Sequence, residues 1–220
     1  MKNENEKTKM DELFQLKGCF YKDEKNKNST FRKLMVIKRK DVDNLKKNDL
    51  SVIMMNPGSA KQTDEYQDVF DKLVDTIPDD TQYQIMEIMD RDNLKFNYAI
   101  IINLSDFVEP KSKEFYKIPS DKKKEYSTFY EKNNNLLRKH INPESIFILA
   151  WGVNEKMSEI AQQAIVVLTK LFGNNIKIVG VKHPLSEYGY YHPLQRNPKY
   201  QEKWVEVISE QIETILQNQS

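Results

Sequence analysis

The chain has 220 residues, of which 39% are hydrophobic and 30% are charged, and its formal net charge is +1. This composition is typical of one globular domain with a substantial core, and the near-zero charge excludes a general attraction to nucleic acid, so DNA binding requires a local basic face. The single cysteine, Cys19, excludes an internal disulfide and any four-cysteine zinc or iron–sulfur site.

The N-terminal segment is charged and rich in Asn, Lys and Glu, and it lacks the apolar core of a signal peptide. We expect residues 1–10 to form a disordered tail and residues 11–220 to form a single domain. No apolar run approaches the ~18 residues that span a membrane, and the scarcity of cysteine is typical of the cytoplasm. The sequence therefore predicts a soluble, cytoplasmic protein without a membrane partner.

Two apolar segments near the N-terminus, Gly18–Tyr21 and Phe31–Ile37, flank a turn-like stretch at residues 23–29. This pattern predicts an N-terminal β-hairpin. Four later runs of apolar, partly β-branched residues are bounded by turn residues, which is typical of buried strands in a parallel sheet. These runs are Leu50–Met55, Tyr98–Leu104, Ile146–Trp151 and Ile176–Val181.

Helices are expected between these strands and after the last one. Tyr66, Phe70 and Leu73 recur at helical spacing and indicate a helix after residue 58. Further helices are predicted at residues 81–90, 124–140, 157–172 and 201–217. The alternation from residue 50 onward predicts an α/β fold, a three-layer α/β/α sandwich with a mainly parallel central sheet.

Polar residues follow three of the predicted strands, namely Asn56, Asn103 and His183. Loops at the carboxyl ends of parallel strands line the ligand crevice of open α/β sheets, so we expect these side chains to converge on one site. Amide and imidazole groups favour a neutral, hydrogen-bonding substrate over a phosphate or a metal ion. The sequence therefore predicts no metal and no cofactor.

Four short segments carry a family resemblance. Met55–Gly58 (Met-Asn-Pro-Gly) resembles the first motif of the uracil-DNA glycosylase superfamily in its Asn-Pro-Gly form, and residues 101–104 (Ile-Ile-Asn-Leu) resemble the strand that ends in a base-recognising asparagine. Residues 147–152 resemble the strand that ends in Leu-Trp-Gly, and His183–Ser186 (His-Pro-Leu-Ser) resembles a shortened second motif. Over residues 15–217 the chain also resembles a bacterial and phage group known as domain of unknown function 1643. Its resemblance to the glycosylases is more distant.

The resemblance implies a uracil-DNA glycosylase-like fold and hydrolysis of the N-glycosidic bond of a damaged or modified base, flipped out of single- or double-stranded DNA, in repair or phage defence. Asn56 is then expected to orient the attacking water through its amide oxygen, because it cannot titrate. His183 is expected to donate to the oxyanion of the departing base. Asn103 offers one acceptor and two donors to the Watson–Crick edge.

Neighbouring residues complete the expected site. Pro57 and Gly58 would let the backbone approach the sugar closely, and Leu185 or a nearby tyrosine would fill the gap that a flipped base leaves. The expected substrate contacts are Pro57, Gly58, Ser59, Asn103, Leu185 and Ser186, and the candidate DNA contacts are Lys182, Tyr190, Tyr191 and Arg196.

Two departures from the glycosylase pattern keep other functions open. The second motif lacks the usual Ser-Pro after His-Pro, and Met55 stands where a glycine is usual. One alternative is a non-catalytic nucleic-acid-binding or protein-interaction module on the same fold. The other is a nucleoside or nucleotide N-glycosidase, which needs no basic DNA groove. Trp151 is expected to be a core residue, and the lysine-rich segment 111–124 a solvated loop.

Overall fold

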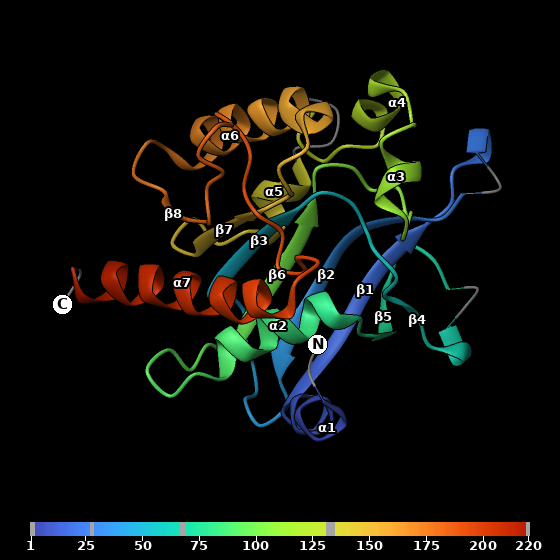
Figure 1. The fold of residues 1–220 in the computed structure, drawn as a ribbon. Coiled ribbons are helices and arrows are strands. Elements are labelled where there is room, and N and C mark those ends of the chain that lie inside the picture. The colour runs from blue at the N-terminus through green and yellow to red at the C-terminus, as the bar shows by residue number, and fades with distance from the viewer. Residues whose placement is uncertain (1–2, 27–28, 67–68, 131–134, 219–220) are drawn as a thin grey trace.

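Strands from both halves of the chain build the centre of the molecule. The computed structural model describes residues 3–26, 29–66, 69–130 and 135–218, and in these residues eight strands form one mixed sheet (Figure 1). Their order across the sheet is β4-β5-β1-β2-β6-β3-β7-β8. The strands are β1 (Phe14–Tyr21), β2 (Phe31–Arg39), β3 (Leu50–Met54), β4 (Lys61–Gln62), β5 (Leu73–Ile77), β6 (Tyr98–Asn103), β7 (Ile146–Ala150) and β8 (Lys177–Val179).

One half of the sheet is parallel and contains the four apolar strands expected from the sequence. β6, β3, β7 and β8 pair in parallel, with Met54 opposite Asn103 on one side and opposite Ala150 on the other. Every residue of β3 and of β7 is buried. Such continuous apolar strands form where both faces of a sheet are covered, which is why the sequence located these strands to within one or two residues.

The other half of the sheet is antiparallel, so the expectation of a mainly parallel sheet is wrong. The β1–β2 hairpin is present, and β2 joins it to the parallel half by pairing antiparallel with β6. The helix expected after residue 58 is replaced by β4 and β5, although residues 67–68 lie outside the described part of the chain. β5 pairs with β1 through Leu73, Val74 and Asp75, because the outer edge of the hairpin offers free backbone groups.

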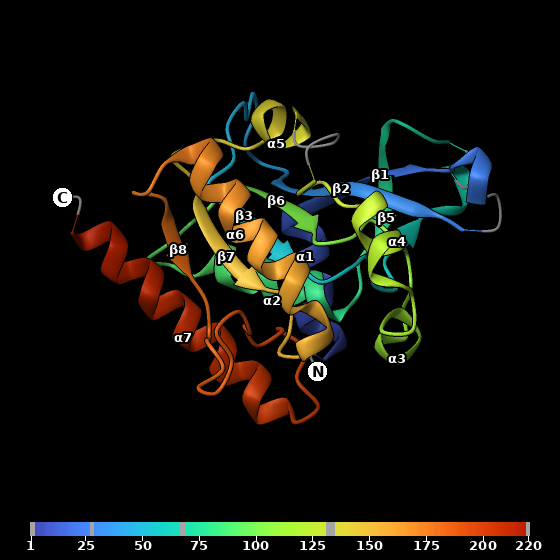
Figure 2. The same cartoon turned by 90° about the horizontal axis from the view of Figure 1, so that it is seen from above.

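Helices cover both faces of the sheet, as Figures 1 and 2 show from two directions. One face carries α1 (Glu4–Leu13), α2 (Asp80–Asp90) and α7 (Pro198–Gln217), and α2 and α7 pack side by side. The other carries α3 (Ser112–Phe115), α4 (Ser120–Glu125), α5 (Asn135–His140) and α6 (Ser158–Phe172). Three short 3-10 turns, η1 (Glu24–Asn26), η2 (Asp64–Tyr66) and η3 (Glu155–Met157), lie in loops.

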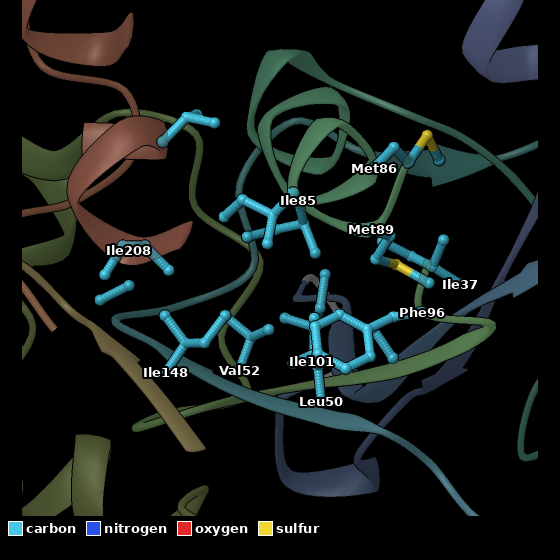
Figure 3. Packing of buried hydrophobic residues seen from close by; sticks show 14 of the residues in the cluster. Ile37, Leu50, Val52, Ile85, Met86, Met89, Phe96, Ile101, Ile148 and Ile208 are labelled. Carbon is cyan, nitrogen blue, oxygen red and sulfur yellow. The ribbon is translucent and has the colours of Figure 1, made fainter. Parts of the chain in front are cut away.

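The core is divided between the two faces. Figure 3 shows the cluster beneath α2 and α7, where Ile85 and Ile208 meet Val52, Ile101 and Ile148 of the sheet. Strand side chains alternate between faces, so Ile53 and Leu149 join the opposite cluster under α6. In α7 the side chains of Trp204, Ile208 and Ile212 are buried, and Ile215 packs partly buried against the same cluster.

Two segments differ from the sequence-based expectation. The tail expected to be disordered contains most of α1. A capping box between Asn3 and Glu6 forms the start of this helix, and its Met10 is buried. The helix expected at 124–140 is divided into α4 and α5, and residues 131–134 lie outside the described residues. No helix in the described ranges is both long and apolar enough to cross a membrane.

Candidate active site

A cavity of about 920 Å³ opens at the carboxyl ends of β3 and β7. It is lined by Met54–Asn56 after β3 and by Trp151–Asn154 after β7. β3 and β7 are neighbours in the sheet. Along the chain, the next parallel strand after β3 is β6, which lies on the side of β3 away from β7, whereas the next strand after β7 is β8, which lies on the side of β7 away from β3. Adjacent strands whose connections diverge in this way leave a crevice between their ends, which is where ligands bind in open α/β sheets. We call this space the site cavity.

The loop after β3 is held in place by Asp79, the N-cap residue of α2. Its Oδ1 accepts the backbone N–H of Thr81 at 2.9 Å, and its Oδ2 accepts the N–H of Ser59 at 3.0 Å and that of Ala60 at 3.2 Å. A Cβ at Gly58 would lie 2.9 Å from the same Oδ2. The glycine of the Asn-Pro-Gly segment is therefore needed for this close approach to Asp79.

Replacing Asp79 by alanine is expected to destabilise the protein by about 2–4 kcal/mol, since it removes a helix cap and leaves loop donors without a partner. Asp79→Asn is the matched control, because it retains one acceptor oxygen and should lose about half as much. Urea denaturation followed by circular dichroism measures both. Equal stability of Asp79→Ala and the wild type would contradict this role of Asp79.

Asn56 lies at the wall of the site cavity, and both N–H groups of its side-chain amide are engaged in hydrogen bonds to the protein. Its Nδ2 donates to the carbonyl oxygens of Pro57, Phe107 and Glu109 at 2.9, 3.3 and 2.8 Å. These bonds tie the loop after β3 to the loop after β6 and fix the amide plane. Because both N–H groups point at backbone carbonyls, the group that Asn56 can still offer a ligand is its side-chain oxygen.

Asn103 ends β6 and has a fully buried side chain. Neither its Oδ1 nor its Nδ2 has a hydrogen-bond partner among the described residues. Asn103 does not itself line the site cavity, but its pairing with Met54 places it on the same face of the sheet as that cavity-lining residue, one strand away. An unsatisfied buried amide costs about 1–3 kcal/mol per group, so native proteins keep such groups mainly at functional sites or beside bound water.

The histidine that lines the site cavity is His192, whereas His183 does not line it. Nδ1 of His192 accepts the N–H of Leu194 at 3.1 Å, and burial lowers its pKa to about 4. The ring is therefore neutral at pH 7, with its proton on Nε2 available to a ligand. His183 accepts from the N–H of Leu185 at 3.2 Å in the same way, and its ring lies 5.4 Å from that of Tyr191.

The sequence itself contains the signal for His192, because His-Pro-Leu occurs twice, at residues 183–185 and 192–194. The first copy was favoured because it follows the strand predicted at 176–181 and because it resembles the second motif. The structure places the second copy at the cavity and the first beside it through Tyr191.

The remaining expected residues divide into two groups. Gly58, Ser59, Tyr191 and Arg196 line the site cavity, whereas Pro57, Leu185, Ser186, Lys182 and Tyr190 do not. Leu185 is 90% exposed at the tip of its turn. Tyr190 packs edge-on against Trp151, with ring centroids 5.3 Å apart, and bridges Gly152 to Lys182. Tyr190 therefore stabilises the loop, which the sequence alone did not indicate.

Several cavity residues were missed by sequence reasoning. Trp151 is buried as expected, but it also lines the cavity together with Tyr116, His192 and Arg32. Ionic groups of the lining are three cations, Arg32, Lys113 and Arg196, against one carboxylate, Glu109. No group of three or more His, Cys, Asp or Glu side chains arranged to hold a metal occurs in the residues that the structure describes.

A second hollow of about 850 Å³ lies near the ends of α1 and α2. Two of its cations, Lys9 and Arg39, both pair with Asp90, and its other charged residues are Asp41, Arg91, Asp92 and Lys95. Asn97 directly precedes β6, so this hollow lies at the amino end of a parallel strand, whereas open α/β sheets bind ligands at the carboxyl ends.

Fold and site together define an α/β protein with a ligand cavity at the switch point of its parallel strands. The family model described as "Protein of unknown function (DUF1643)" matches residues 36–194, and the chain belongs to this family. No curated protein matches the chain. A mutant of the feruloyl esterase module from Clostridium thermocellum, complexed with sinapinate, is 11% identical over 72% of this chain and 62% of that chain. Its TM-score of 0.27 is too low to support an inference.

Proposed function

We propose that the protein hydrolyses the N-glycosidic bond of a damaged or modified base that is flipped out of DNA, on a uracil-DNA glycosylase-like three-layer fold. The observation that carries the proposal is the pair of asparagines at neighbouring strand ends. Asn56 has only its oxygen left to offer the site cavity, and Asn103 has a buried amide without a partner in the described structure. A positioned water and a base whose edge bonds to Asn103 would satisfy both.

The proposed hydrolysis needs little acid–base catalysis by side chains that change their protonation state. Water held by the oxygen of Asn56 attacks C1′ of the sugar, and the C1′–N bond breaks with its electron pair passing to the base. The proton that the water loses passes to the departing base through solvent. The neutral imidazole of His192 is placed to donate from Nε2 to the oxyanion of the base, the role that sequence reasoning assigned to His183.

Two surface features support a polymeric substrate. Lys113 and Arg196 are exposed cations at the lining of the site cavity, where phosphates flanking a flipped nucleotide would lie. Leu185 projects from the neighbouring turn with 90% of its surface exposed. An apolar side chain so presented suits insertion into a base stack, which compensates for the extruded base.

Abasic-site formation in a panel of oligonucleotides tests the proposal. Single- and double-stranded DNA would carry uracil, thymine mismatches, deaminated purines and hydroxymethylated or glucosylated cytosine. We expect alkali-labile sites at one of these bases and none at unmodified pairs. DNA binding without any cleavage would instead favour a non-catalytic binding module.

Hydrolysis of nucleosides or nucleotides is a second candidate, because the net charge of +1 provides no general attraction to a polymer. The same bases supplied as mononucleotides separate the two candidates. Release of base from mononucleotides but not from oligonucleotides would replace DNA by a free nucleotide as the substrate.

A further inference from the structure

Arg32, near the start of β2, is a buried cation at the site cavity. It is 1% exposed, yet it lines the cavity. Its Nη1 donates to the carbonyl oxygen of Ala60 at 3.4 Å, and its Nε has no partner among the described residues. A guanidinium carries five N–H donors, so this side chain retains donors for a ligand.

The charge of Arg32 is only loosely balanced. Burial lowers its pKa to about 10, opposed by the carboxylates of Asp79 and Asp106, and it stays protonated at neutral pH. Asp79 uses its oxygens on the loop after β3 and the start of α2. Burial raises the pKa of Asp106 well above its usual value, which weakens the second counter-charge. A bidentate carboxylate partner, the usual arrangement for a buried arginine, is missing from the described contacts.

The surroundings of Arg32 favour a planar ring over a phosphate. The cavity wall includes the apolar or aromatic side chains Met54, Tyr116, Trp151 and Tyr191. The exposed cations Lys113 and Arg196 are better placed to meet a hydrated phosphate from solvent. A buried guanidinium in a cavity whose wall is partly apolar and aromatic matches the carbonyl oxygen of a heterocycle.

We propose that Arg32 donates to a carbonyl oxygen of the base and stabilises the negative charge that gathers there as the C1′–N bond breaks. This inference rests on the proposed function and names its substrate class: a pyrimidine or an oxopurine, whose carbonyl is conjugated with the departing nitrogen. Adenine has no such oxygen and is excluded.

Leaving-group dependence tests the proposal. Uracil and 5-fluorouracil in oligonucleotides differ in how readily the base departs, the fluorinated base being the better leaving group. Arg32→Met should lose about 10²–10³-fold in kcat on uracil and clearly less on 5-fluorouracil, with Arg32→Lys intermediate. Equal losses on both bases would indicate a merely structural arginine and overturn the proposal.

Arg39→Met is the matched control, because Arg39 lies at the other end of β2 and pairs with Asp90 away from the site cavity. It should retain wild-type kcat on both bases. Thermal melts of all variants check folding, and Arg32→Lys keeps the test decisive if Arg32→Met does not fold.

Binding of the free base separates this inference from the proposed reaction. Fluorine NMR titration with 5-fluorouracil should show binding to the wild type and at least tenfold weaker binding to Arg32→Met, even if no substrate is cleaved. That result would support the subsite while the hydrolase proposal fails. Equal binding by both proteins, no binding by the wild type, or Arg32-dependent binding of inorganic phosphate in place of the base would each overturn the inference.

Discussion

Asn56→Ala is expected to lower base release by about 10²–10³-fold, and Asn56→Asp is expected not to rescue it. An aspartate would be the stronger base in water, but here it would place a carboxylate oxygen against the three carbonyl oxygens that Nδ2 now contacts. Loss of those bonds should also destabilise Asn56→Asp by about 2–4 kcal/mol at neutral pH. Single-turnover kinetics and urea denaturation measure the two effects.

The pH dependence of Asn56→Asp provides the control. Carbonyl dipoles raise the pKa of the introduced carboxyl above its unfolded value of about 4, so the folded state binds the proton more tightly. The stability deficit should therefore shrink as the pH falls toward 4 and grow as the pH rises. Faster base release by Asn56→Asp at pH 7 would contradict the positioning role assigned to the amide.

Trp204→Ala is expected to destabilise the protein by about 3–5 kcal/mol, as is typical when a buried large aromatic side chain is truncated. Trp204 is 1% exposed, and its Nε1 donates to the carbonyl oxygen of Tyr191 at 2.9 Å. This bond joins α7 to the loop that carries His192 into the site cavity. Chemical denaturation should show the full loss in the free energy of unfolding.

Trp204→Phe separates packing from the hydrogen bond. It retains most of the ring and should cost about 1–3 kcal/mol, with base release reduced because the loop loses its attachment to α7. A variant as active and as stable as the wild type would show that the indole N–H does not position Tyr191 and His192. Trp151 makes the corresponding bond to Tyr188, at 2.6 Å, from the opposite side of the loop.

Local pattern was sufficient for the parallel half of the fold. β3 and β7 are apolar at every position, and α7 shows a clear buried stripe at Trp204, Ile208 and Ile212. In contrast, β5 was taken for part of a helix, because its strand structure depends on pairing with the edge of β1, a contact that no local window contains.

The site was only partly predictable for the same reason. Asn56 lies at the cavity because it comes two residues after the end of a buried strand. The choice between His183 and His192 depends on how two tryptophans hold the intervening loop, which sequence spacing does not encode. Arg32 gave no signal, since an arginine next to Lys33 at the start of a strand looks like a solvent-facing residue.

The most direct test of N-glycosidic bond hydrolysis by this protein is to follow the fate of water oxygen in the reaction. The protein would be incubated with the oligonucleotide panel in water enriched in oxygen-18, and the products analysed by mass spectrometry. We expect an unlabelled free base and a heavy oxygen at C1′ of the sugar, and neither product with Asn56→Ala. Intact oligonucleotides across the whole panel, or label in the released base, would contradict it.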